Sequence, residues 1–149
     1  MAEFSLQALH DEIEADPMGL GYKDGADWKE DAEIVALINA LEGPGAAQIM
    51  RKLIMPSEIW NSIPYSEYET YGASKREWLD TALELAGGSG VIDANDSVVY
   101  DNLIAVFPAG SDARANLLSK IRRTGSRAEV LWDEGTVVTI SQVGHAANL

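Results

Sequence analysis

Cysteine is absent from the chain, and its absence excludes several kinds of site. Without a thiol there is no thiolate nucleophile, no disulfide framework, no iron–sulfur cluster and no cysteine-ligated zinc. A domain of 149 residues buries roughly 68 to 70% of the surface that its unfolded chain exposes. Because that is enough for a hydrophobic core, we expect the fold to depend on apolar packing alone.

Long apolar runs are also missing. No stretch approaches the roughly 18 uninterrupted apolar residues that a membrane-spanning helix requires. The first sixteen residues carry acids where a secretion signal would carry bases, so we expect no signal peptide. The sequence therefore predicts a soluble protein without a membrane partner.

Basic residues are scarce relative to acids. Eleven lysines and arginines face 24 aspartates and glutamates, which gives a formal net charge of −13. A chain of this charge repels phosphate backbones and anionic lipid headgroups. We therefore expect neither nucleic acid nor membrane among its partners.

The charge is distributed unevenly. Residues 1–42 hold eleven acids and two lysines, whereas residues 111–132 hold five bases and two acids. Two interpretations stay open: both regions are solvated helix faces, or they meet, within one molecule or between neighbouring copies of an assembly. In the second case complementary charge would fix register. The arginines that we single out as interface candidates are Arg114, Arg122, Arg123 and Arg127.

Patterns typical of catalysis or metal binding are lacking as well. The two histidines, His10 and His145, have no zinc-site spacing, and no Gly-x-Ser-x-Gly turn occurs. Residues 93–97, "DANDS", lack the glycine and the distant glutamate of a calcium loop, so we interpret them as a helix cap. Most carboxylates cluster at predicted helix starts, which favour negative charge. We expect a protein that is not an enzyme and has no cofactor and no metal.

The segment "DPMGLGY", residues 16–22, is interpreted as a structural turn. The residue before a proline is pushed out of the α region, and glycines take positive φ without steric cost. The Gly-x-Gly pair is not a nucleotide loop, because the third glycine, the preceding strand and the lysine of such loops are absent. The residues of this predicted turn are Asp16, Pro17, Gly19, Gly21 and Tyr22.

Apolar residues recur at helical spacing between proline and glycine stops. We predict an all-α fold in the main, a compact bundle of six to eight short helices forming a single domain over residues 1–149. At most one short β-hairpin or extended segment is expected: residues 45–55 fit either a helical turn or an extended link, and "TVVTI", residues 136–140, could pair as a strand. The predicted helical segments are residues 5–15, 27–43, 56–63, 66–88, 95–107, 111–123, 127–135 and 141–148, with Ser5, Ser111 and Ser141 among the caps.

Aromatic side chains supply the large anchors. Most of the four tryptophans are expected in the core or half-buried, and Trp78 is placed on the buried face of its helix together with Leu79, Ala82, Leu83 and Leu85. The segment "PYSEYETYG" carries three tyrosines within seven residues, which cannot share one helical face. At least one should project outward, and tyrosine is enriched at interfaces. The predicted contact surface comprises Tyr65, Tyr68 and Tyr71.

Three segments resemble a family of small virion structural proteins of tailed, siphophage-like bacteriophages. They are "DPMGLGY" followed by "DAEIVALINA", then "PSEIW", and finally "GSRAEVLWDEGTVVTISQV". In the family the first segment reads much like aspartate-proline-leucine-glycine-x-glycine-tyrosine before a similar helix. Residues 24–30 depart from the family pattern.

The resemblance implies a non-enzymatic virion component and carries over no catalytic residue. It implies a capsid-associated cement or decoration protein that stabilises the head. A neck, head–tail connector or tail adaptor protein is the alternative, and a cytoplasmic assembly factor is the second alternative. The expected partners are other phage structural proteins, either the major capsid protein or connector proteins. The protein would be homo-oligomeric or lattice-bound, located in the virion, and present in the host cytoplasm during assembly.

Overall fold

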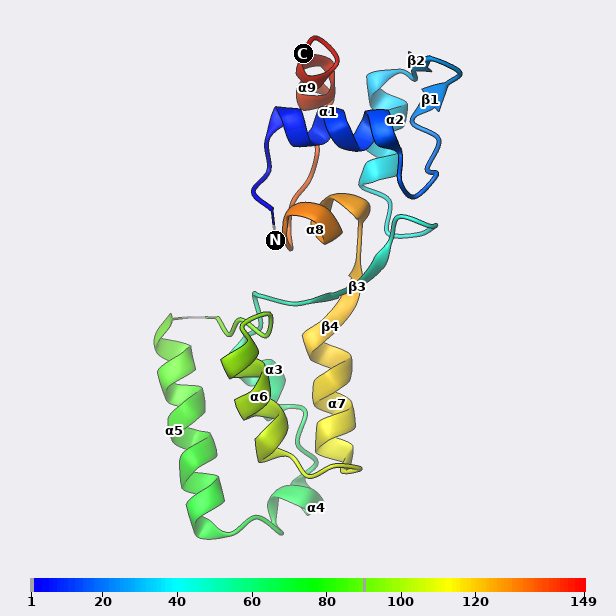
Figure 1. Ribbon diagram of the computed structural model, residues 1–149. Helices are drawn as coiled ribbons and strands as arrows, with labels where there is room; N and C mark the ends of the chain where they lie inside the picture. The colour runs from blue at the N-terminus through cyan, green and yellow to red at the C-terminus, as the bar shows by residue number, and fades with distance from the viewer. Residues whose placement is uncertain (1, 90) are drawn as a thin grey trace. The chain divides into compact units, whose positions relative to one another are not determined.

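The computed structural model describes the backbone of residues 2–89 and 91–149, and their side chains except at positions 82 and 85–89. This part of the chain contains nine helices and four short strands (Figure 1). The helices are α1 (Leu6–Ala15), α2 (Asp31–Ile38), α3 (Pro56–Trp60), α4 (Tyr65–Tyr68), α5 (Ala73–Ser89), α6 (Ser97–Val106), α7 (Asp112–Ile121), α8 (Arg127–Trp132) and α9 (Ile140–Ala146). The strands are β1 (Lys23–Asp24), β2 (Asp27–Trp28), β3 (Ala47–Met50) and β4 (Arg122–Gly125).

The prediction of a mainly helical chain is confirmed. Two small sheets accompany the helices, because β1 pairs with β2 in antiparallel fashion and β3 pairs with β4. The chain forms two compact units: unit 1 comprises Met1–Ile49 and Thr124–Leu149, and unit 2 comprises Met50–Arg123. The unit boundaries fall within β3 and β4. The single domain over residues 1–149 stays a prediction.

Unit 1 is built from two stretches that are distant in sequence. Helix α9 packs against α1 and α2, and Figure 1 shows the blue α1 and the red α9 next to each other. Asn39, at the end of α2, donates from Nδ2 to the Val138 carbonyl at 2.8 Å and accepts from the Val138 amide at 3.0 Å. The buried core of unit 1 consists of Leu9, Ile13, Tyr22, Ile34, Ile38, Ala128, Trp132, Val138, Val143 and Ala146.

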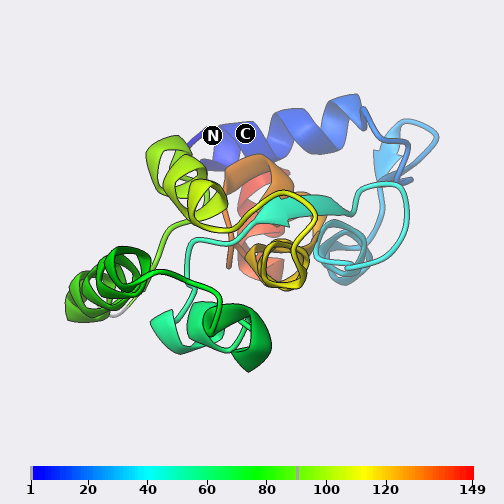
Figure 2. The ribbon, with the colours of Figure 1, turned by 90° about the horizontal axis from the view of Figure 1, so that it is seen from below.

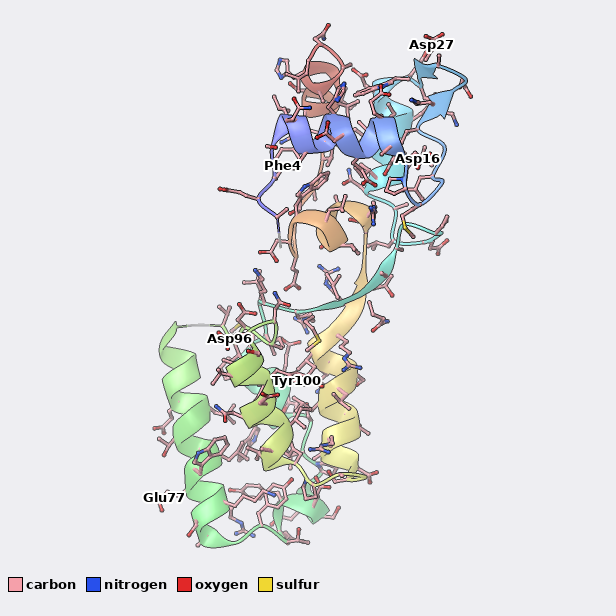
Figure 3. All side chains as sticks on the ribbon, viewed as in Figure 1. Phe4, Asp16, Asp27, Glu77, Asp96 and Tyr100 are labelled. Carbon is pink, nitrogen blue, oxygen red and sulfur yellow. The ribbon has the colours of Figure 1, made fainter. Side chains whose placement is uncertain are left out.

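The turn after α1 is organised by the carboxylate of Asp16. This residue caps the helix in the left-handed conformation, with φ of 38°. Its Oδ1 accepts from the Leu20 amide at 2.7 Å and its Oδ2 from the Gly21 amide at 2.8 Å (Figure 3). Gly19 and Gly21 both have positive φ, 65° and 78°. The turn thereby delivers Tyr22 fully buried into the core of unit 1.

A buried ion pair links α1 to α8. Arg127 donates from Nε to Glu12 Oε1 at 2.7 Å and from Nη2 to Oε2 at 3.0 Å. The side chains are only 12% and 7% exposed, respectively. Gly45 passes so close that a Cβ there would lie 3.1 Å from the Cβ of Arg127. Hydrogen bonding to Glu12 raises the pKa of Arg127. In this pair the acidic and the basic region of the sequence meet within one molecule.

Unit 2 has its own core. Helix α3 packs against both α5 and α7. An isolated antiparallel bridge joins Ile54 to Ile92, and Asp96 caps α6 by accepting from the Val98 and Val99 amides, as the helix-cap interpretation of residues 93–97 predicts. The buried residues of this core are Ile54, Ile59, Tyr71, Leu79, Ile92, Ala94, Phe107, Ala113, Leu117 and Ile121.

Several predicted boundaries are wrong. Residues 27–28 form β2 instead of starting a helix. Of the two alternatives left open for residues 45–55, the extended one is present, because β3 lies there. The predicted helix 66–88 divides into α4 and α5, and α5 continues through the glycines at 87 and 88. Within "TVVTI", residues 136–139 belong to no strand, because Asn39 occupies the backbone hydrogen-bonding groups of Val138. The cap of α9 is Thr139 rather than Ser141.

Tryptophan burial differs from the prediction too. Trp132 is buried and Trp28 half-buried, but Trp60 and Trp78 are exposed. Trp78 lies next to the buried Leu79 on α5, on the side of the helix that the core does not cover. Ala82 and Leu85, also predicted on the buried face, lie outside the described side chains.

Replacing Gly21 by valine should destabilise the fold. At φ of 78° a β-branched residue is strained, and a left-handed residue other than glycine costs roughly 1–2 kcal/mol. We expect the free energy of unfolding in urea to fall by at least about that amount. Ala26→Val, at an exposed position without positive φ, is the control and should change stability by less than about 0.5 kcal/mol. Equal stability of the two variants would contradict the assignment of Gly21 to a left-handed position that favours glycine.

Replacing one residue of the buried ion pair should destabilise the protein more than replacing both residues. Glu12→Gln or Arg127→Met alone leaves a buried group without its partner, for which we expect a loss of about 3 kcal/mol. The double variant should lose clearly less than the sum of the two single variants. A double-mutant cycle measured by urea unfolding checks this, and additive losses would show that the two residues do not interact.

Candidate interaction surface

Three aromatic side chains are exposed in the described part of the chain, and all three lie in unit 2. Tyr65 is 76% exposed, Trp78 46% and Trp60 42%. Single exposed apolar residues are common, but a contiguous group marks an interaction site. Trp60 and Tyr65 form such a group, because both line one surface hollow.

We define the Trp60 surface as the residues that line the two hollows sharing this tryptophan. The first hollow lies at α3 and α4, and the second at α3 and α5. Figure 2 shows the teal α3 and the green α5 close together, as their contacts require. The members of the surface are Pro56, Ser57, Trp60, Asn61, Ile63, Tyr65, Tyr68, Asp80, Leu83 and Glu84.

Trp60 is exposed because of its place in a very short helix. Helix α3 has five residues, and Ile59 is its buried anchor in the core of unit 2. The following residue is rotated by about 100°, which carries the Trp60 ring out to the surface. Pro56 occupies the first turn, where its missing N–H costs no hydrogen bond.

Glu58 fixes α3 in place through both its side chain and its backbone. Its carboxylate accepts from Arg51 Nη1 at 2.7 Å and from the Met55 amide at 2.9 Å, which caps the helix. Its carbonyl oxygen accepts from Lys120 Nζ at 3.2 Å and from Ser62 Oγ at 2.9 Å. The hydrogen bonds from Arg51 and then from Met55 lower the pKa of Glu58. The helix that carries Trp60 is therefore held from several sides.

Behind Trp60 the aromatic rings form a connected series. The centroids of Trp60 and Tyr68 are 5.2 Å apart, and those of Tyr68 and Tyr71 are 5.9 Å apart, both in edge-to-face arrangement. The guanidinium of Arg76 lies 4.8 Å from the Tyr68 ring, and Lys75 Nζ lies 4.0 Å from the Tyr71 ring. Such contacts favour one orientation of each ring. The exposed Trp60 edge is thus preorganised.

The innermost ring is tied to two helices. Tyr71 is buried, and its hydroxyl donates to Glu67 Oε2 at 3.0 Å. The same oxygen accepts from the Ala113 amide at the start of α7, at 3.2 Å. Burial and the hydrogen bond to Glu67 raise the pKa of Tyr71. Tyr71, one of the predicted contact residues, thus lies in the core of unit 2 behind Tyr68.

Of the predicted interface residues, Tyr65 and Tyr68 belong to the Trp60 surface, whereas the arginines do not. None of the four arginines is among the residues that line either hollow. Arg114 donates to the Ile104 carbonyl at 2.7 Å, Arg122 donates to Tyr100 Oη at 3.2 Å, and Arg127 is paired inside unit 1. Arg123 lies in β4. Trp60, Asp80 and Glu84 were not predicted as surface residues of this site, because the spacing of apolar residues does not show which neighbour of a buried residue is exposed.

Two other kinds of site are not found among the described residues. They contain no group of three histidine, aspartate or glutamate side chains arranged to hold a metal ion. Within the same part of the chain, no helix is both long enough and apolar enough to cross a bilayer.

Comparison of the chain with protein-family models, with curated proteins and with solved structures finds no match.

Removing the Glu58 carboxylate should change how stability depends on pH. A carboxyl group whose pKa is lowered by folding stabilises the native state above its unfolded pKa, about 4.3, and this contribution is lost as the pH falls through the folded pKa. Glu58→Gln should lower stability at neutral pH by about 1 kcal/mol and flatten the acid limb of the stability curve. Urea unfolding at a series of pH values from about 3 to about 7 measures both the loss of stability and the slope of the acid limb. Glu69→Gln, at an exposed carboxylate, is the control; the same curve for both variants would contradict the role of Glu58.

Proposed function

We propose that this protein is a non-enzymatic structural protein of a tailed-bacteriophage virion, and that it acts as a capsid-associated cement or decoration protein. The observation that carries the proposal is the Trp60 surface, an exposed aromatic surface held in one arrangement by the residues behind it. Exposed, ordered aromatic side chains are the typical anchors of protein interfaces. The resemblance of residues 16–22 and 125–143 to phage virion proteins supplies the biological setting.

The chemistry of the surface favours contact over catalysis. Among the described side chains, the charged ones that line its two hollows are the carboxylates Asp80 and Glu84, without a histidine, lysine or arginine. Acid–base or nucleophilic catalysis needs a base within hydrogen-bonding reach of a nucleophile or a proton donor. A surface of tryptophan, tyrosine and aliphatic side chains instead offers area that is stabilised by burial against another protein.

In this role each copy would bind at a junction between shell subunits. The free energy of one contact is modest, but contacts accumulate when many copies cover a closed lattice. The acidic residues 1–42 of unit 1 would face a basic surface of the major capsid protein, where charge complementarity fixes orientation. The compact helical bundle and the homo-oligomeric or lattice-bound state belong to this proposal.

Mass spectrometry of purified particles tests the location. A cement protein should be present in hundreds of copies, in proportion to the major capsid protein. A count of about six to twelve would overturn that assignment in favour of a neck, connector or tail adaptor ring. Absence from particles, together with presence in infected cells, would instead indicate an assembly factor.

Shortening the exposed aromatics should reduce incorporation into particles. Tyr65→Ala and Trp60→Ala each remove an anchor, and an anchor residue contributes enough binding free energy for a roughly tenfold loss of occupancy. Trp78→Ala is the matched control, because Trp78 is a similarly exposed tryptophan of unit 2 outside the Trp60 surface. Thermal unfolding of the isolated variants shows that they are folded. Equal incorporation of the Trp60 and Trp78 variants would contradict the proposed contact.

A further inference from the structure

The lining of the hollow at α3 and α5 is partly apolar and partly acidic. Pro56, Trp60 and Leu83 form what we call its apolar wall, and Asp80 and Glu84 form what we call its acidic wall. An apolar wall accepts the aliphatic part of a side chain, and the carboxylates accept hydrogen bonds from a cationic end. The hollow thus combines the two features that a long basic side chain needs.

The acidic wall continues along α5. Glu77, Asp80 and Glu84 follow one another at spacings of three and four residues, which places them on one face of the helix. Figure 3 shows Glu77 projecting from α5 away from the other helices of unit 2. None of the three carboxylates makes a hydrogen bond or ion pair with another described residue.

The two basic side chains of α5, Lys75 and Arg76, lie over tyrosine rings. Arg76 is four residues from Asp80, the spacing that favours an ion pair on a helix. Instead, its guanidinium lies over the Tyr68 ring and donates to the Glu69 carbonyl at 2.8 Å. Lys75 likewise lies over the Tyr71 ring. Neither of these two bases of α5 therefore pairs with Asp80 or Glu84.

We propose that this hollow binds an arginine side chain from a basic segment of a partner protein. The guanidinium would stack on the exposed Trp60 ring and donate to the Asp80 or Glu84 carboxylate. Arginine suits the hollow better than lysine, because its planar group can stack on an aromatic ring and bind a carboxylate through two parallel hydrogen bonds. This inference rests on the proposed role of the Trp60 surface as a contact with another protein.

A second copy of the chain is the less suitable occupant. The net charge of −13 opposes self-association in general. In addition, each of the six arginines already interacts within its own chain. Five of them form hydrogen bonds: Arg51, Arg76, Arg114, Arg122 and Arg127. Arg123 also has an interaction partner. A partner with free arginines on a basic segment would not have to break such bonds.

Peptide binding to the full-length chain tests the inference. The probe is a blocked peptide of four Arg-Ser-Leu repeats, and the same peptide with lysine in place of arginine is its counterpart. Titration at about 0.15 M salt limits long-range attraction, and nitrogen-15 spectra report the four tryptophan indole N–H signals, assigned through Trp→Phe variants. We expect the Trp60 signal to shift most and the arginine peptide to bind more tightly than the lysine peptide.

Two double variants distinguish peptide binding in the hollow from general attraction of the peptide to an acidic protein. Asp80→Asn with Glu84→Gln should weaken binding of the arginine peptide by about fivefold or more, as should Trp60→Leu. Asp27→Asn with Glu33→Gln removes the same charge from two exposed positions of unit 1 and should change the dissociation constant by less than about twofold.

Three results would overturn the inference: equal weakening by both paired variants, a Trp60 signal that does not move, or self-association that Asp80→Asn with Glu84→Gln abolishes in sedimentation. The particle experiment is separate. If the peptide binds at Trp60 but the protein is absent from particles, the proposed function fails and the arginine site stands. If incorporation depends on Trp60 but the peptide does not bind there, the arginine site fails and the proposed function stands.

Discussion

The buried ion pair between Glu12 and Arg127 is the contact on which unit 1 depends most. It joins α1 to α8 across more than a hundred residues of sequence, and both charged groups are almost fully removed from water. A buried charge is tolerated only when it is paired and hydrogen-bonded, so each residue requires the other. The close passage of Gly45 beside Arg127 and the burial of Tyr22 follow from the same arrangement, since both belong to the packing around this pair.

In unit 2, polar contacts also hold a structural element in place, and that element is helix α3. A helix of five residues is too short to be stable by itself, so α3 depends on the burial of Ile59 and on the hydrogen bonds among Glu58, Arg51 and Lys120. Those bonds leave its last residue, Trp60, on the outside. The same polar contacts that make the helix possible therefore also determine which aromatic ring is presented to a partner.

Local features of the fold could be predicted from the sequence, and long-range ones could not. The caps Ser5 and Ser111 and the mainly helical character follow from short-range hydrogen bonding and spacing, and the structure confirms them. Residues 136–139, which could have paired as a strand, belong to none, because Asn39, about a hundred residues away, satisfies the backbone of Val138. At the candidate site, outward projection was predicted within the tyrosine cluster, where Tyr65 is exposed. The exposure of Trp60 depends on where α3 ends and on which neighbouring residue enters the core.

The division of the chain into one continuous and one discontinuous unit has a consequence during synthesis. Every residue of the unit 2 core lies between Ile54 and Ile121, so this core can form as soon as that stretch has left the ribosome. The core of unit 1 also needs residues 128–146, which are made last. Until then the apolar residues of α1 and α2 lack the partners that α8, Val138 and α9 supply in the finished core. The order of synthesis therefore allows the core of unit 2 to form while that of unit 1 is still incomplete.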